Sequence, residues 1–176
     1  TVLEIGPGKG ALTEKLLETG CTVIAVEKDN DLLEFLKEKF SAQIASRSLV
    51  LVHDDILDFD IKKIIAKQNY KIIANIPYNI TGAILKKFLT SEHQPESMVL
   101  MVQHEVAKRI VARDNKESIL SISVKAYGEP KLIMKVAARY FSPAPKVDSA
   151  VIQIKNISRK FFSENPEPSE VSGLLA

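Results

Sequence analysis

Short apolar runs alternate along this chain with longer amphipathic segments, and few folds accommodate that alternation. Strands that are separated by helices pair in parallel, so the pattern predicts an α/β fold with a largely parallel sheet. Residues 118–127 fit neither the helical nor the strand period, and the last two strands are expected to form a hairpin. We expect strands at residues 2–5, 22–26, 49–52, 71–74, 98–102, 132–136 and 150–154.

The composition is that of an ordinary globular protein. The chain has 176 residues, of which 45% are hydrophobic and 26% charged, enough for one domain with a substantial core. No run of about 18 uncharged apolar residues occurs, which argues against a membrane span. A single cysteine, Cys21, excludes an internal disulfide and favours a reducing compartment. We therefore expect a cytoplasmic protein.

Charge is distributed unevenly along the chain. Residues 1–60 carry 6 Lys and Arg against 12 Asp and Glu, whereas residues 101–160 carry 12 against 5. The basic part can meet a polyanion such as nucleic acid. The alternative is a solvated surface whose charges balance across the fold, and charge alone does not choose between the two.

A glycine-rich stretch follows the first strand and precedes a helix. Gly6 and Gly8 allow a tight turn and a close approach of backbone to ligand. Glu27 lies 21 residues after Gly6, where a carboxylate accepts hydrogen bonds from ribose hydroxyls. Both features indicate an adenosine-containing cofactor, although a nicotinamide dehydrogenase shares them. Glu4, two residues before Gly6, favours S-adenosylmethionine, because a carboxylate suits a cationic cofactor and would repel a pyrophosphate.

Polar groups also follow the third and fourth strands. Asp55 can accept a hydrogen bond from an adenine amine, or it can serve as a cap for the helix expected near Asp60. Asn75, Pro77 and Tyr78 form the most specific signal in the chain. The Asn75 oxygen and a nearby backbone carbonyl can each accept a hydrogen bond from one N–H of an exocyclic amine while the Tyr78 ring stacks on the base. The Tyr78 hydroxyl has no role in this interpretation.

Three stretches together resemble a known family. Residues 2–13 (VLEIGPGKGALT), 75–80 (NIPYNI) and 141–151 (FSPAPKVDSAV) are similar to those of the ribosomal RNA adenine N6,N6-dimethyltransferases, most of all the small-subunit branch. The resemblance implies a Rossmann-like class I methyltransferase fold with a seven-stranded, mostly parallel sheet and helices on both faces. It covers residues 1–157, expected to be the catalytic domain. Residues 158–176 are expected to be a linker or the start of a C-terminal helical domain.

The family also implies parts that this chain does not contain. Its members carry a Gln-Asn-Phe-Leu-like segment before the first strand and a small helical domain after the sheet. We therefore expect the sequence to be a fragment that lacks the first segment and most of the second domain. The family pattern would also make residues 118–127 helical.

The resemblance implies methyl transfer from S-adenosylmethionine, leaving S-adenosylhomocysteine, to N6 of adenines in small-subunit rRNA or its precursor. Asn75 and Pro77 would orient the target amine, and Tyr78 and Phe141 would stack on the flipped base. The basic residues expected to face RNA are Lys108, Arg109, Arg113, Arg139 and Lys146. We expect no metal site, no membrane contact and a monomer.

Three alternatives remain open. The erythromycin-resistance methyltransferases, which act on large-subunit rRNA, share the fold and the first motifs. A non-catalytic RNA-binding assembly factor could keep the same fold, although the intact Asn75–Tyr78 stretch argues against it. A nicotinamide-dependent oxidoreductase is disfavoured by Glu4 and by the same stretch.

Overall fold

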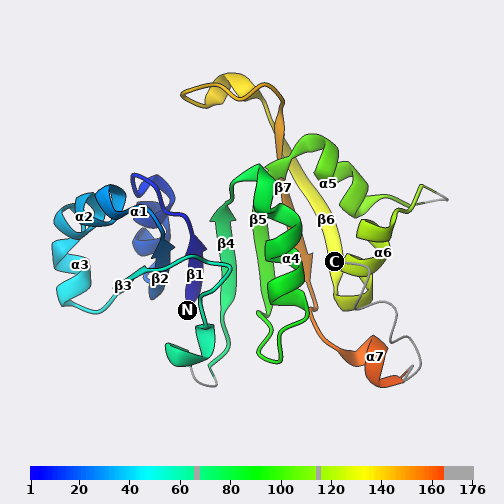
Figure 1. The fold of residues 1–176 in the computed structure, drawn as a ribbon, viewed down its shortest axis with the longest axis horizontal. Helices are drawn as coiled ribbons and strands as arrows, with labels where there is room; N and C mark the ends of the chain where they lie inside the picture. The colour runs from blue at the N-terminus through cyan, green and yellow to red at the C-terminus, as the bar shows by residue number, and fades with distance from the viewer. Residues whose placement is uncertain (66–67, 114–115, 165–176) are drawn as a thin grey trace. The chain divides into compact units, whose positions relative to one another are not determined.

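The computed structural model describes residues 1–65, 68–113 and 116–164. Contacts between residues divide the chain into two compact units, Thr1–Asn75 and Ile76–Ala176. All seven predicted strands are present, four in the first unit and three in the second (Figure 1). Among the residues described, no helix has the length and apolar character needed to cross a membrane.

The first unit is built from parallel strands that alternate with helices. Its strands lie in the order β3-β2-β1-β4, and every neighbouring pair is parallel. This arrangement brings the carboxyl ends of all four strands to one edge of the sheet. The elements are β1 (Val2–Ile5), α1 (Ala11–Glu18), β2 (Val23–Glu27), α2 (Asn30–Lys39), α3 (Ser41–Ala45), β3 (Leu49–His53), the 3-10 helix η1 (Ile61–Lys63) and β4 (Lys71–Asn75).

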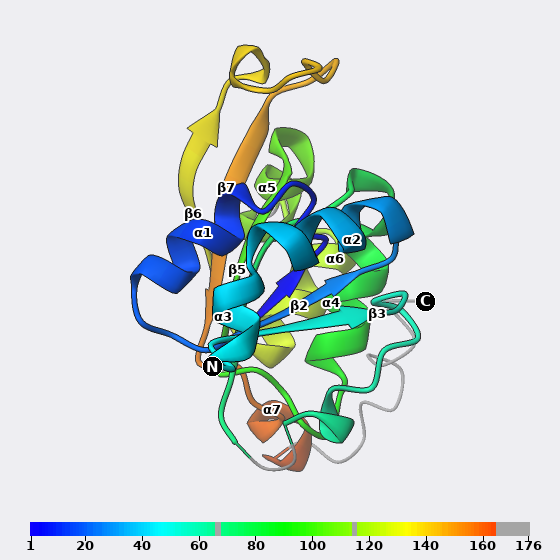
Figure 2. The same cartoon turned by 90° about the vertical axis from the view of Figure 1, so that its left-hand side faces the viewer.

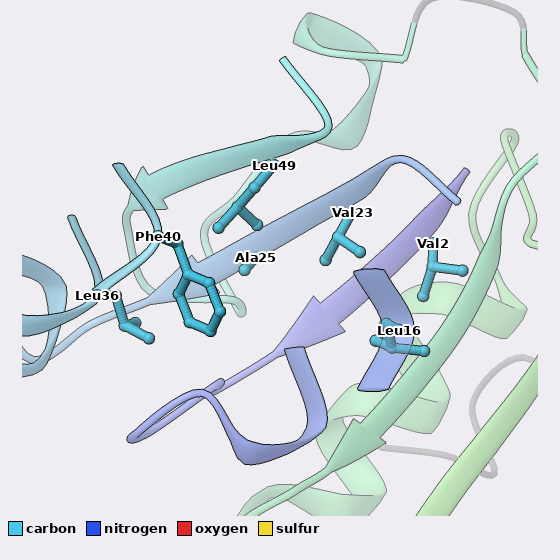
Figure 3. Close-up of a cluster of buried hydrophobic side chains, with 7 residues drawn as sticks. All are labelled: Val2, Leu16, Val23, Ala25, Leu36, Phe40 and Leu49. Carbon is cyan, nitrogen blue, oxygen red and sulfur yellow. The ribbon is translucent and has the colours of Figure 1, made fainter. Parts of the chain in front are cut away.

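Both faces of the central strands are covered, as expected for strands that are apolar throughout. Every residue of β1 and β2 is buried. On one face, side chains of β1, β2 and β3 meet apolar residues of α1 and α2 in a compact cluster (Figure 3). The cluster consists of Val2, Leu16, Val23, Ala25, Leu36, Phe40 and Leu49. This packing fixes where β1 and β2 end, and therefore where the loops after them begin.

The second unit has three strands in the order β5-β7-β6, with β7 antiparallel to both neighbours. The predicted hairpin of the last two strands is confirmed, and its connecting loop extends beyond the ends of both strands (Figure 2). The elements are the 3-10 helix η2 (Tyr78–Ile80), α4 (Thr81–Leu89), β5 (Ser97–Gln103), α5 (His104–Val111), α6 (Ile119–Tyr127), β6 (Glu129–Val136), the 3-10 helix η3 (Ala138–Tyr140), β7 (Ser149–Lys155) and α7 (Lys160–Glu164).

The ambiguous stretch 118–127 is helical, as the family pattern implies. Ser118 caps α6: its hydroxyl accepts from the Ser121 amide, and the Ser121 hydroxyl accepts from the Ser118 amide. This reciprocal pair satisfies two amides at the start of the helix.

The segment after β7 contains the short helix α7, in which the Phe162 ring lies 4.6 Å from the Tyr127 ring. The first part of the segment expected to be a linker is thus packed against α6. The rest of that expectation, residues 165–176, falls outside the described residues. The boundary between a catalytic domain at 1–157 and a following segment stays a prediction.

Candidate active site

The loop between β1 and α1 bends through three glycines with positive φ: 62° at Gly6, 58° at Gly8 and 79° at Gly10. A Cβ on Gly10 would lie 2.5 Å from the Phe40 ring, so packing requires glycine there. A Cβ on Gly6 or Gly8 would meet nothing within 4 Å. At these two positions the loop leaves open space beside its backbone, which is where a ligand can approach closely.

Glu27, the last residue of β2, lies against this loop. Its Oε2 accepts a hydrogen bond from the Gly8 amide at 3.2 Å, and its Oε1 accepts from the amides of Lys28 and Asp29, both at 2.9 Å. The residue is only 7% exposed. Each carboxylate oxygen can accept more than one hydrogen bond. The carboxylate is therefore held in place beside the open space while retaining acceptor capacity, and this arrangement fits a ribose.

Glu4, in the middle of β1, is 1% exposed, and its Oε2 has no hydrogen-bond partner of good geometry in the described part of the chain. Burial raises the pKa of this carboxyl from 4.5 to about 7, although the nearby hydroxyl and amide of Thr13 partly offset the rise. Burial in low dielectric disfavours the ionised form of a carboxyl. A cationic ligand group beside Glu4 would favour that form again.

Stability should depend on pH through Glu4. Below about pH 4.5 the carboxyl is protonated in both the folded and unfolded chains; between pH 4.5 and 7 only the folded chain keeps the proton. As the pH rises from 4.5 to 7, the free energy of unfolding therefore falls, by roughly 3 kcal/mol for a pKa shift of this size. Urea unfolding at a series of pH values measures this decline. The decline should be absent in Glu4→Gln and unchanged in Glu18→Gln, which alters an exposed residue. An identical decline in both variants would contradict the role of Glu4.

Asp55 lies just after β3, at the same edge as Glu27. Its carboxylate is already engaged: Oδ2 pairs with the Lys28 ammonium at 2.7 Å, and Oδ1 accepts from the Leu57 amide at 2.9 Å. The ammonium end of the pair is largely exposed, and exposed ion pairs contribute little stability. Lys28 can therefore give way to another donor, and the predicted role of Asp55 toward adenine stays a prediction.

Asn75 is the exposed last residue of β4. Because β4 pairs in parallel with β1, with Leu3 opposite Ile72, Asn75 lies at the edge of the sheet that carries the glycine loop. Pro77, with φ −58° and ψ 134°, precedes the 3-10 helix η2, and its carbonyl accepts from the Ile80 amide at 3.3 Å. The chain thus turns shortly after Asn75, and only two residues separate Asn75 from Tyr78.

The Tyr78 hydroxyl has a partner that the sequence did not indicate. It lies 2.6 Å from the Ser149 hydroxyl, at the start of β7. Ser149 is completely buried, whereas Tyr78 is half-buried. One end of the ring is therefore anchored to the sheet of the second unit, which restricts its orientation. The sequence assigned this hydroxyl no partner, and the expectation that it is not needed for activity stays a prediction.

Replacing Tyr78 by phenylalanine should destabilise the chain by about 1–3 kcal/mol, because the buried Ser149 hydroxyl loses its partner. The double variant Tyr78→Phe and Ser149→Ala should recover part of the loss, since it removes both polar groups. Urea unfolding of the two single variants and the double variant measures the coupling. Strictly additive effects would show that the hydrogen bond contributes nothing.

Phe141 follows η3 in the loop between β6 and β7, and it is half-buried. Asp148 holds this loop at both ends: its Oδ1 accepts from the Ala138 amide at 3.0 Å, and its Oδ2 pairs with the Lys135 ammonium at 2.6 Å. Lys135, and then the Ala138 amide, lower the pKa of Asp148. The adjacent residues Asp148 and Ser149 thus restrain the segment that carries Phe141 and the ring of Tyr78.

The five basic residues predicted to face RNA are all exposed. They fall into two groups in the second unit. Lys108 and Arg109 lie in the last turn of α5, and Arg113 follows it; Arg139 and Lys146 lie in the loop between β6 and β7. Helix α5 packs against β6 and β7, while Arg113 lies beside Gly128, Glu129 and Pro130 at the start of β6. Their contact with RNA stays a prediction.

Metal-binding residue types are scattered rather than gathered. Within the described ranges, no group of three or more His, Cys, Asp or Glu side chains could hold a metal ion.

Comparison with known proteins matches residues 1–167 to the family model described as ribosomal RNA adenine dimethylase. The chain belongs to this family. The match extends through both units and includes every candidate site residue named above. The expected resemblance is therefore confirmed.

Relatives within the ribosomal RNA adenine dimethylase family are similar in sequence. A protein of Dehalococcoides mccartyi (strain CBDB1) named ribosomal RNA small subunit methyltransferase A is 48% identical over 155 residues, which are 88% of this chain and 52% of that protein. A protein of the same name from Fusobacterium nucleatum is 41% identical over 172 residues, 97% of this chain and 62% of that protein. The chain thus spans about half to two-thirds of the length of these relatives.

Solved structures confirm the predicted class I, Rossmann-like methyltransferase fold with seven strands. A dimethyladenosine transferase from Plasmodium falciparum has a TM-score of 0.79 at 29% identity, covering 94% of this chain and 58% of that one. The 23S rRNA methyltransferase ErmE has a TM-score of 0.76 at 30% identity, covering 88% and 60%. The N-terminal domain of human METTL16, in complex with SAH, shares only the fold, with a TM-score of 0.61 at 11% identity.

Proposed function

We propose that this chain is the methyltransferase part of an enzyme that converts adenosines of small-subunit rRNA to N6,N6-dimethyladenosine with S-adenosylmethionine. The observation that carries the proposal is the Asn75-Ile76-Pro77-Tyr78 stretch, which begins at the edge of the sheet that carries the glycine loop and Glu27. A relative that is 48% identical is named ribosomal RNA small subunit methyltransferase A.

The first unit would hold the cofactor. Glu27 would accept from its ribose hydroxyls, Asp55 from its adenine amine after exchange with Lys28, and the open space at Gly6 and Gly8 would admit the rest. When bound, S-adenosylmethionine supplies a methyl group on a positively charged sulfur. The buried Glu4 carboxyl adds negative charge to this region once it ionises.

The protein's part in the reaction is positioning. The Asn75 carboxamide oxygen would accept a hydrogen bond from the adenosine N6 amine, which aims the nitrogen lone pair. The Tyr78 ring, anchored through Ser149, and the Phe141 ring, on a loop restrained by Asp148, would stack on the flipped base. A neutral carboxamide cannot take the proton, so orientation rather than general base catalysis would supply the rate enhancement.

The exposed basic residues on α5 and in the loop between β6 and β7 would bind the RNA backbone. Binding should then weaken with salt, with a slope of about −0.7 for each single-stranded phosphate contacted. A small-subunit rRNA substrate, or its precursor, would place the protein in the cytoplasm. We expect it to act there as a monomer.

The large ribosomal subunit is the second candidate substrate, because the structure of the 23S rRNA methyltransferase ErmE superposes with a TM-score of 0.76. The test is to incubate the purified full-length enzyme and labelled S-adenosylmethionine with unmodified small or large subunits and to analyse the nucleosides by mass spectrometry. We expect dimethyladenosine from small subunits alone. Dimethyladenosine from large subunits alone would select the second candidate, and none from either would contradict both.

A further inference from the structure

The most exposed aromatic ring that the structure describes lies next to a residue of the candidate site. Tyr140 is 70% exposed, compared with 57% for Ile119, the next most exposed of the large apolar and aromatic side chains in the described ranges. Tyr140 is the last residue of η3, and Phe141 follows it directly. A ring this exposed adds little to the stability of the fold, because its apolar surface stays in water. Its position must be explained by something other than core packing.

The guanidinium of Arg139 contacts this ring. Its guanidinium carbon lies 5.2 Å from the centre of the Tyr140 ring, and its Nη2 is 3.4 Å from the Tyr140 hydroxyl. The guanidinium therefore lies over the ring, and the pair presents two planar groups, one of them cationic. Planar aromatic and guanidinium groups are the surfaces on which unpaired RNA bases stack.

The surroundings carry the charge that such a ligand needs. Lys135, near the end of β6, and Lys146, in the following loop, are exposed and add to the charge of Arg139. From Lys131 to the start of β7, the sequence contains one acidic residue, Asp148, which is paired with Lys135. This balance favours a polyanion over an acidic or neutral protein surface.

We propose that Arg139 and Tyr140 form a second stacking platform, which binds an unpaired RNA base adjacent to the target adenosine. The proposal rests on the proposed function, since it takes the target base to be the one that Phe141 contacts. The Cα atoms of consecutive residues are about 3.8 Å apart, so a ring next to Phe141 can reach only a neighbouring nucleotide. Phe141 has extended backbone, with φ −109° and ψ 150°, so the side chains of Tyr140 and Phe141 point in different directions and contact different bases.

The chain contains no tryptophan, so a single introduced indole reports on its own surroundings. In Tyr140→Trp, a short single-stranded oligoadenosine RNA should quench tryptophan fluorescence, because a base stacks on the indole. Phe35→Trp is the matched control: Phe35 is also exposed, at 46%, but lies on α2 in the acidic first part of the chain. Its fluorescence should not change.

Affinity is measured in parallel by the anisotropy of a labelled copy of the same RNA. Tyr140→Ala should weaken binding roughly five- to a hundredfold, and Tyr140→Phe should restore it. Ile119→Ala, which truncates another exposed apolar side chain on α6, should bind as the unchanged chain does. Arg139→Lys should bind more weakly while keeping the same salt slope, because it retains the charge but loses the planar group.

The outcomes separate the two proposals. RNA binding without quenching at position 140, equal quenching at positions 35 and 140, or unchanged affinity in Tyr140→Ala would overturn the platform and leave the proposed function intact. No binding of the unchanged chain to RNA at low salt would count against the proposed RNA substrate and overturn the platform with it.

Discussion

Replacing Asn75 by alanine should lower the rate of methyl transfer at least about a hundredfold, because the amine of the target base would no longer be aimed. The affinity for S-adenosylhomocysteine should change much less, since the proposed ribose and adenine contacts are those of Glu27 and Asp55. Single-turnover methylation gives the rate, and calorimetry gives the affinity. The variant should fold normally, because Asn75 is exposed at the end of β4.

Asn79 provides a matched control for this experiment. It is the same residue type, is also exposed, and lies four residues further along in η2. Asn79→Ala should therefore transfer methyl groups at the unchanged rate. Equal losses in the two variants would mean that the turn after β4, rather than the Asn75 carboxamide, limits the reaction.

Replacing Glu27 by alanine should weaken S-adenosylhomocysteine binding at least tenfold, since each hydrogen bond to a charged group is worth roughly 1.5–3 kcal/mol. Two losses combine in this variant. The ribose would lose the acceptors that the proposed site gives it, and the Gly8 amide loses the carboxylate that holds the glycine loop against β2.

Calorimetry with S-adenosylhomocysteine measures the effect. The affinity of Glu27→Gln should lie between those of Glu27→Ala and the unchanged chain, because glutamine keeps one oxygen acceptor without the charge. Glu34→Ala removes an exposed glutamate of α2 that pairs with Lys37, and it should bind normally. If Glu27→Ala bound as tightly as the unchanged chain, Glu27 would have to be removed from the proposed site.

The first unit could be predicted almost entirely from the sequence. Its strands are short and apolar, and the first three are separated by a glycine-rich loop and by helices, so local pattern and tertiary packing agree. Glu27 illustrates this: its distance from Gly6 predicted a carboxylate beside the glycine loop, and the structure shows it bonded to the Gly8 amide.

Helix α6 could not be predicted from periodicity, for a physical reason. Its apolar residues Ile119 and Ile122 are 57% and 49% exposed, while Ser121 and Ser123 are fully buried. Burial therefore runs opposite to hydrophobicity at these four of the nine residues of the helix. The sequence did contain one indication of a helix start, Ser118 followed three residues later by Ser121, whose side chains accept hydrogen bonds from each other's amides. Two serines are a weaker indication of a capping box than Ser or Thr followed by Glu or Gln.

The hydrogen-bond and ion-pair partners of the site residues could not be predicted from the sequence either. Tyr78 and Ser149 are 71 residues apart, and only the paired strands of the second unit determine where Ser149 lies. The same holds for Lys28 and Asp55, 27 residues apart. Sequence indicates which side chains carry chemistry, but contacts between distant segments determine how each is held.

The three glycines of the first loop are constrained for two different reasons. Gly10 is required by the Phe40 ring beside it, whereas Gly6 and Gly8 border open space. A descendant that lost its catalytic role would still need Gly10 to fold, but it could drift at Gly6 and Gly8 toward asparagine or aspartate, which tolerate positive φ. A homologue that has lost Gly6 and Gly8 but retains Gly10 would therefore be expected to keep the fold without the catalytic activity.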